Sequence, residues 1–148
     1  MESSERIEFR SLCYNARVMP SLLTISLVAL GGAVGSVSRY LLGVWIQSAS
    51  QSVDFPFGTL TVNLLGCFVI GFLSQLAESR GVFTPETRGL VFIGVLGGFT
   101  TFSSFGNDTL NLLRDGETVN ALLNIGANVI FGLALVWVGR TVAFWIWR

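Results

Sequence analysis

Residues 97–105 combine types that a membrane-spanning helix usually avoids. They read Gly-Gly-Phe-Thr-Thr-Phe-Ser-Ser-Phe and lie inside an apolar run. Adjacent glycines followed by hydroxyl residues weaken a helix. Non-helical backbone at membrane depth is tolerated only where protein buries it or where it lines a cavity, and its freed carbonyl groups can coordinate a cation. We therefore expect the helix to break between Gly97 and Thr101.

Phe102 and Phe105 lie three residues apart, so they share one face of a helix. An aromatic stripe of this kind is usually packing. The edge of a phenyl ring carries partial positive charge, however, so two rings could also accompany a dehydrated anion. The residues alone leave both interpretations open. Thr101 and Ser104 add hydroxyl groups to the same segment.

Further polar residues stand inside apolar runs, where they are costly and therefore informative. Arg39 either reaches the membrane interface or supplies a fixed positive potential that attracts an anion. Asn63 must find partners inside the protein, so its amide either joins helices or solvates a small anion through its N–H donors. Thr59 precedes Asn63 by four residues and shares its helical face, and Asn128 follows Asn124 at the same spacing.

Four apolar stretches carry these residues, at about 21–46, 57–77, 90–113 and 119–145. Each supplies the roughly 20 residues that a helix needs to cross a bilayer. Only 12% of the 148 residues are charged, which is about half of the usual share in a soluble domain. The sequence predicts an all-α membrane protein of four transmembrane helices in the cell membrane.

The composition argues against several other classes of protein. The chain has no Lys and no His, and its nine Arg do not form the clusters that nucleic-acid binding requires. Cys13 and Cys67 are too few for a disulfide framework or a zinc site. Because no nucleophile–base pair is evident, we do not expect an enzyme. Because basic clusters are missing, we do not expect a nucleic-acid partner.

The first eighteen residues differ from the rest of the chain. They hold three acids and three Arg without apolar periodicity, and Met19 then stands directly before the first apolar stretch. We interpret 1–18 as an extension that is disordered or follows from a wrongly assigned start, and 19–148 as the four-helix transmembrane domain.

The charge asymmetry that orients membrane proteins is weak here. If the chain starts at Met19, Arg80, Arg88 and Arg148 lie on one side of the membrane and Arg114 on the other. Such a small excess specifies orientation poorly. The chain could therefore insert in both directions.

Three motifs occur in order along these stretches: Gly-x-x-x-Arg-Tyr-Leu-Leu-Gly around Arg39, Phe-Gly-Thr-Leu-x-Val-Asn-Leu-x-Gly around Asn63, and the segment 97–105. Together they resemble the small fluoride channels of the CrcB (Fluc) family, over about residues 22–142. The resemblance implies a passive channel that exports fluoride and lowers its cytoplasmic concentration. It also implies an antiparallel, dual-topology homodimer with two pores along the dimer interface.

The resemblance also assigns roles to individual residues. Phe102 and Phe105 would be the paired rings that line the pores, Asn63 a polar pore residue, and Arg39 the first-span arginine of the family. The remaining expected pore residues are Thr59, Thr101, Ser104 and Asn128. The backbone carbonyls of Gly97 and Thr100 would surround a sodium ion that is structural and is not transported.

Departures from the family pattern leave the assignment of the outer polar residues of the pore undecided. Asn128 and Gly132 stand where several relatives carry serine, and Asp108 stands where relatives often carry glutamate. A heterodimer with a second homologue is an alternative to the homodimer. A small multidrug-type exporter needs a buried Glu in the first span, which here has no acid and contains Arg39. Another solute transporter, or a non-transporting membrane assembly subunit, also stays as an alternative function.

Overall fold

The computed structural model describes residues 21–147. The extension 1–18, the candidate initiator Met19 and Arg148 lie outside the described residues. Over 21–147 the chain is helical and contains no strand, as the apolar pattern predicts. The helices in chain order are α2 (Leu22–Ser50), α3 (Phe57–Arg80), α4 (Pro85–Arg88), the π-helix η1 (Gly89–Leu96), α5 (Gly97–Phe99), α6 (Phe102–Arg114), α7 (Thr118–Gly126), the π-helix η2 (Ala127–Phe131) and α8 (Gly132–Ile146).

Four spans in the described part are long and apolar enough to cross a membrane, which confirms the predicted number. The third consists of α4, η1, α5 and α6, and the fourth of α7, η2 and α8. Each ends within a few residues of its predicted bounds. Each also exceeds the roughly 20 residues of a hydrocarbon core, so it can cross with some tilt. The spans are Leu22–Ser50, Phe57–Arg80, Pro85–Arg114 and Thr118–Ile146.

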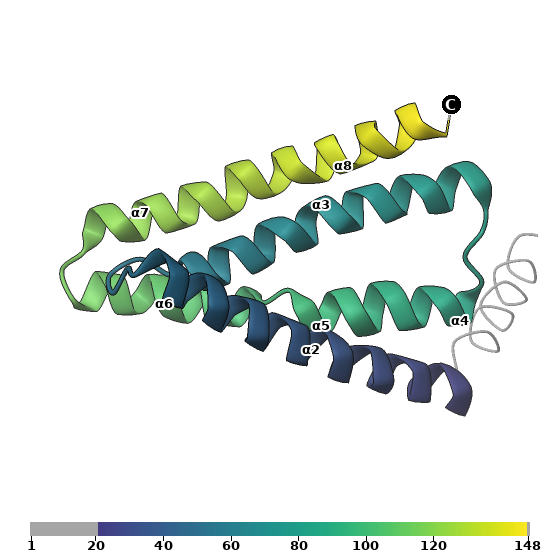
Figure 1. Cartoon of the computed structure of the whole chain (residues 1–148), viewed down its shortest axis with the longest axis horizontal. Helices are drawn as coiled ribbons and strands as arrows, with labels where there is room; N and C mark the ends of the chain where they lie inside the picture. Colours follow the sequence, from purple (N-terminus) through teal and green to yellow (C-terminus); the bar gives the residue numbers. More distant parts are fainter. Residues whose placement is uncertain (1–20, 148) are drawn as a thin grey trace, which may run out of the picture.

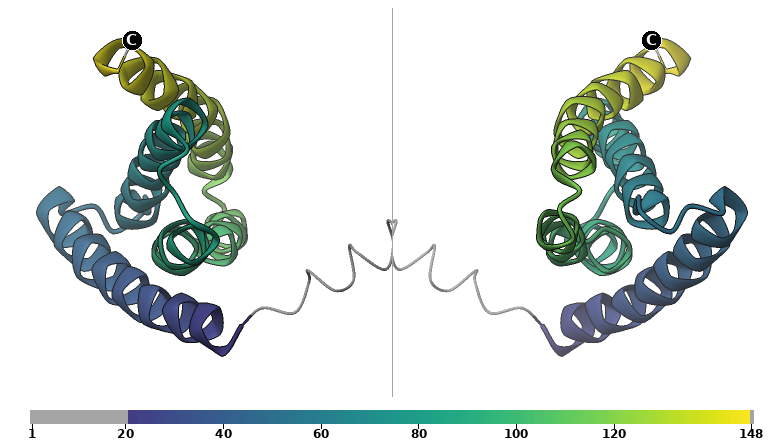
Figure 2. Two further views of the ribbon diagram at one scale, coloured as in Figure 1. Left: turned by 90° about the vertical axis from the view of Figure 1, so that its right-hand side faces the viewer. Right: turned by 90° about the vertical axis from the view of Figure 1, so that its left-hand side faces the viewer.

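The spans run along the length of the molecule and alternate in direction, so their turns gather at its two ends (Figure 1). The turn between α2 and α3 lies at the same end as the turn between α6 and α7. The turn between α3 and α4 lies at the other end with the close of α8. Seen end-on, α3 lies between α2 and α8, with the third span beside them (Figure 2).

Glycines allow the spans to approach each other closely. A Cβ atom on Gly35 would clash with the carbonyl oxygen of Val95, so α2 packs backbone against backbone on the third span. Likewise, a Cβ on Gly71 would clash with the carbonyl of Val136, where α3 packs on α8. Lipid offers little hydrophobic drive for association, so membrane helices depend on such close packing. Two tight pairs of spans result.

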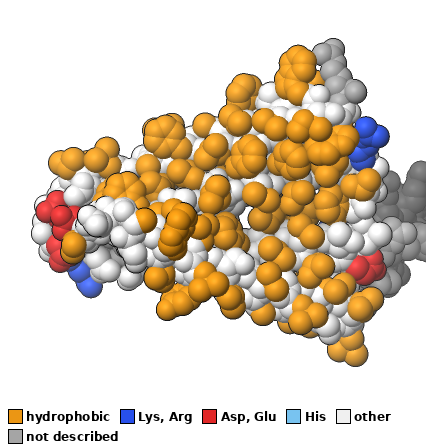
Figure 3. Space-filling view, viewed as in Figure 1, with side chains coloured by type: hydrophobic (Ala, Val, Ile, Leu, Met, Phe, Trp, Pro, Cys, Tyr) orange, Lys and Arg blue, Asp and Glu red, His pale blue; other side chains and the backbone are white. Residues whose placement is uncertain are grey.

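The outer face of the molecule is apolar, and charged side chains gather near its two ends (Figure 3). Large apolar side chains such as Leu30, Trp45 and Trp137 are each about two-thirds exposed. Soluble monomers rarely expose contiguous apolar surface of this extent. At one end Arg140 forms an ion pair with Glu78. The distribution is that of a multi-pass membrane protein.

Candidate functional site

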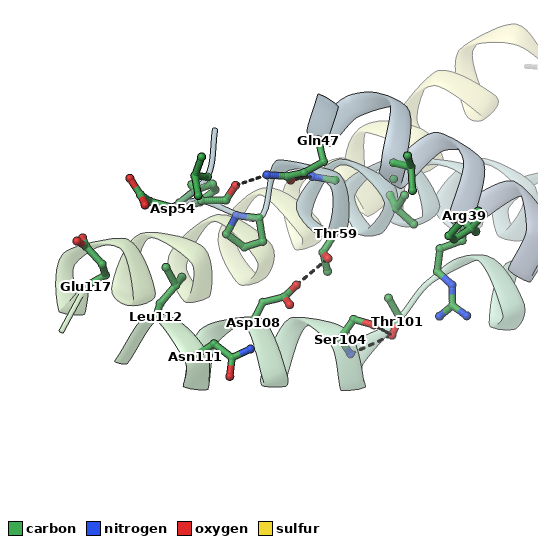
Figure 4. Close-up of a pocket in the computed structure, with 18 of the residues that line it drawn as sticks. Arg39, Gln47, Asp54, Thr59, Thr101, Ser104, Asp108, Asn111, Leu112 and Glu117 are labelled. Atoms are coloured by element: carbon green, nitrogen blue, oxygen red, sulfur yellow. Dashed lines mark hydrogen bonds between the residues drawn. The ribbon is translucent and has the colours of Figure 1, made fainter. Parts of the chain in front are cut away.

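Two cavities lie on either side of Thr101, whose side chain lines both. The first, here called the groove, has a volume of about 730 Å³ and lies between α2, the turn after it, α3 and α6. Asp54 and Glu117 line its end near the turns, and Arg39 lines it farther along α2 (Figure 4). The second, here called the phenyl cavity, has a volume of about 370 Å³ and lies between α3, the third span and η2.

Arg39 places an unpaired positive charge in the groove. The side chain is half-buried and makes no hydrogen bond or ion pair to any residue in the described range. Asp108, the acid of α6 that lines the same groove, is instead engaged by Thr59, whose hydroxyl donates to its Oδ2 at 2.7 Å (Figure 4). An arginine without a partner among the described residues is compatible with both predictions for it, a side chain that reaches the membrane interface and a fixed positive potential that attracts an anion. The Thr59 hydroxyl, in turn, is directed at a carboxylate.

The turn between α2 and α3 is held by one side chain of the groove wall, Gln47. Its Nε2 donates to the carbonyls of Ser52 and Phe55 at 2.7 and 3.1 Å, and its Oε1 accepts from the Gly58 N–H at 3.0 Å. These bonds satisfy backbone groups that a turn leaves free. Gln47 thereby fixes the mouth of the groove.

Between the two cavities, Thr100 and Thr101 are extended. α5 ends at Phe99 and α6 begins at Phe102, while Thr101 has φ −149° and ψ 109°. The Thr101 side chain caps α6, because its Oγ1 accepts from the Ser104 N–H at 3.1 Å. It also donates to the Ser104 Oγ at 3.0 Å, which leaves the Ser104 hydroxyl hydrogen free to donate. The first turn of α6, with its partial positive charge, therefore begins at the wall between the cavities.

Asn63 on α3 holds the extended segment in place. Its Oδ1 accepts from the Thr101 N–H at 2.9 Å, and its Nδ2 donates to the Thr101 carbonyl at 3.2 Å. The remaining N–H of Nδ2 is directed at Oδ1 of Asn128, at 3.0 Å. Both N–H groups of Asn63 thus have protein acceptors, so an anion at this position would have to compete with them.

The phenyl cavity brings five of the predicted pore residues together: Asn63, Thr101, Phe102, Phe105 and Asn128. The ring centroids of Phe102 and Phe105 lie 5.4 Å apart at an interplanar angle of 60°. Phe105 is half-buried, whereas the ring of Phe102 is 83% exposed. A core-packing role is therefore excluded for Phe102 within a single chain. Gly97 and Thr100 also line this cavity.

The comparison with known sequences assigns the family. Residues 26–140, which include most of all four spans and both cavities, match the family described as CrcB-like protein, Camphor Resistance (CrcB). The chain belongs to the CrcB-like family.

Curated members similar to this CrcB-like protein carry the name fluoride-specific ion channel FluC. The protein from Methylobacillus flagellatus is 47% identical over 115 residues, which cover 78% of this chain and 90% of that protein. The one from Chlorobium chlorochromatii is 47% identical over 122 residues, covering 82% and 93%. The one from Elusimicrobium minutum is 48% identical over 125 residues, covering 84% and 97%.

The predicted residues of this CrcB-like protein divide between the two cavities. Arg39, Thr59 and Ser104 line the groove but not the phenyl cavity. The sequence did not single out Gln47 or Thr109. The signal for Gln47 was a polar side chain near the end of an apolar stretch. Thr109 gave no signal of its own, because its hydroxyl is buried only by the packing of α6 against α7.

Proposed function

We propose that this protein is a fluoride-specific ion channel that lets fluoride leave the cytoplasm down its gradient. The observation that carries the proposal is the identity of 47–48% to three proteins of that name, over nearly their whole lengths. A channel family is not an enzyme class. Hydrogen fluoride crosses membranes as a neutral acid and ionises inside, so a passive exit for the anion is sufficient to lower its concentration.

The proposed path runs through the groove, past the wall at Thr101, and into the phenyl cavity. Fluoride gives up its water only where donors are close and dense. The free hydroxyl of Ser104, the first N–H groups of α6 and the ring edges of Phe102 and Phe105 supply such donors without a full charge. Arg39 concentrates anions in the groove but lies outside the phenyl cavity. Fluoride is therefore bound weakly enough at the rings to be released.

We further propose that the pores are completed by a second copy in an antiparallel homodimer. The phenyl cavity is open in one chain, and the 83% exposed ring of Phe102 has room for a partner surface. Arg80, Arg88 and Arg140 lie at one end and Arg114 at the other, and Glu78 neutralises Arg140. This small charge difference is compatible with insertion in both orientations. A second homologue could take the place of the second copy.

A structural sodium ion at the carbonyls of Gly97 and Thr100 fits the hydrogen bonding of the extended segment. In an unbroken helix these carbonyls would accept from the N–H groups of Thr101 and Ser104. Those two N–H groups donate instead to Asn63 Oδ1 and to Thr101 Oγ1. The carbonyls are thus free to bind a cation. Hard cations take about six or more oxygen ligands, so a second copy would have to supply part of the shell.

Fluoride efflux from liposomes tests the proposed function. The protein starting at Met19 is reconstituted, fluoride and chloride release are followed with ion-selective electrodes, and the full-length chain serves as comparison. We expect fluoride release without chloride release. Folded protein that releases no fluoride would overturn the proposal and favour an assembly subunit. A multidrug-type exporter is not favoured, since α2 contains no acid.

A further inference from the structure

Asn124 is the most deeply buried polar side chain of residues 21–147, with an exposed fraction of 0%. It lies in the last turn of α7, directly before the π-helix η2 that carries Asn128. A π-helical turn is wider than an α-helical one and is frequent at functional sites. A buried amide is costly unless its donors and acceptors are satisfied, so its partners indicate what it does.

The side-chain partners of Asn124 lie on two other elements, Thr109 on α6 and Asn128 on η2. Its Nδ2 donates to Oγ1 of Thr109 at 2.9 Å, and that hydroxyl donates to the carbonyl of Phe105 at 2.8 Å. Its Oδ1 and its backbone carbonyl both accept from Nδ2 of Asn128, each at 3.0 Å. Asn124 therefore contacts the turn that carries a pore ring and the amide that faces Asn63.

These bonds fix which end of the Asn128 amide faces the cavity. Because both N–H groups of Asn128 are directed at Asn124, its Oδ1 is left to accept from Asn63 at 3.0 Å. A flipped Asn128 would present N–H groups to the N–H groups of Asn63, and no bond would form. Asn63 cannot flip in compensation, because Thr101 engages both of its ends. The hydrogen bonds among the three amides therefore run in one donor-to-acceptor direction, from Asn63 to Asn128 and from Asn128 to Asn124.

We infer that Asn124 is a positioning residue for fluoride selectivity, acting through Asn128 on Asn63. This inference rests on the proposed function. While Asn124 holds the Asn128 amide, the N–H groups of Asn128 stay out of the phenyl cavity, and an anion there can compete only for the donors of Asn63. An Asn128 amide released from Asn124 can swing its own N–H groups into the cavity, where they retain fluoride and also accept a larger anion. Loss of Asn124 therefore lowers fluoride flux and lowers the ratio of fluoride flux to chloride flux.

The test measures fluoride and chloride efflux from liposomes for four full-length proteins: wild type, Asn124→Ala, Asn128→Ala and the double variant. Asn124→Ala should lower fluoride flux by about tenfold, the factor expected for the loss of two hydrogen bonds, and should lower the fluoride-to-chloride ratio. The double variant should be no slower than Asn128→Ala, since Asn124 acts through that residue. Asn120→Ala, which removes an amide bonded only to Glu117 one turn earlier, is the matched control.

A second pair of variants guards against loss of folding in Asn124→Ala. Thr109→Val removes the acceptor of Asn124 Nδ2 at nearly constant side-chain volume, so it should lower the fluoride-to-chloride flux ratio. Thr109→Ser keeps a hydroxyl acceptor and should have the wild-type ratio. Wild-type flux and ratio in both Asn124→Ala and Thr109→Val would overturn the inference, as would effects that multiply in the double variant. Failure of the proposed function itself is distinguishable, because the wild type would then release no fluoride.

Discussion

Asn63→Asp is the substitution whose effect follows most directly from the hydrogen bonds of the site. The carboxylate keeps the acceptor for the Thr101 N–H but loses both N–H donors. The lost bonds are those to the Thr101 carbonyl, at 3.2 Å, and to Asn128 Oδ1, at 3.0 Å. In their place, a negatively charged oxygen faces two carbonyl oxygens.

The expected loss of conduction is large compared with the stability that the two lost hydrogen bonds contribute. Two hydrogen bonds within a membrane protein contribute about 1 kcal/mol together. A like charge about 4 Å from a passing anion costs about 4 kcal/mol at an effective dielectric constant of roughly 20. Since each 1.4 kcal/mol is about a factor of ten in rate, fluoride flux should fall by nearly a thousandfold while the protein stays folded.

Fluoride efflux from liposomes measures this loss, with size-exclusion profiles in detergent to show that the variant folds. Asn120→Asp adds the same charge at the start of α7, outside both cavities, and should leave the flux near that of the wild type. The reasoning is refuted if folded Asn63→Asp keeps more than about a tenth of wild-type flux.

Three further outcomes follow from the structure. Phe102→Ile should abolish most fluoride flux but change the melting temperature little, because the ring is largely exposed within one chain. Phe131→Ile, at an exposed position on η2, is the control. Normal fluoride flux in Phe102→Ile would contradict the proposed path. Gly71→Ala should destabilise the protein by about 1–3 kcal/mol in thermal denaturation, since the added Cβ meets the Val136 carbonyl. Gly126→Ala, whose added Cβ meets open space, should not destabilise it. Equal melting temperatures of the two variants would count against the tight pairing of α3 and α8. Replacing sodium by N-methylglucamine should lower the melting temperature in a concentration-dependent way, and no change would argue against the sodium site.

The four spans were predictable because lipid demands long apolar helices, and composition alone reveals them. The polar residues worth examining were also predictable, since polar side chains at membrane depth are costly. Asn63 is an example: its type predicts an interior partner. Its actual partners, Thr101 and Asn128, are 38 and 65 residues away in the chain, and only the packing of α3 against the third and fourth spans brings them together.

Other features of the site had no local signal. The π-helices η1 and η2 could not be predicted, because neither 89–96 nor 127–131 contains a residue type that dictates a wider turn. The sequence left open whether the amide of Asn63 joins helices or solvates an anion, and in the structure both of its N–H groups donate to acceptors on Thr101 and Asn128. The engagement of Thr59 by Asp108 likewise depends on α3 meeting α6.

The reversal potential of the reconstituted protein in a planar bilayer tests the central claim most directly. With a tenfold fluoride gradient, equal chloride on both sides and no other driving force, a fluoride-selective channel should reverse at roughly 59 mV, with the sign set by the anion. A reversal potential near zero, one of the opposite sign, or no current from folded protein would contradict the account.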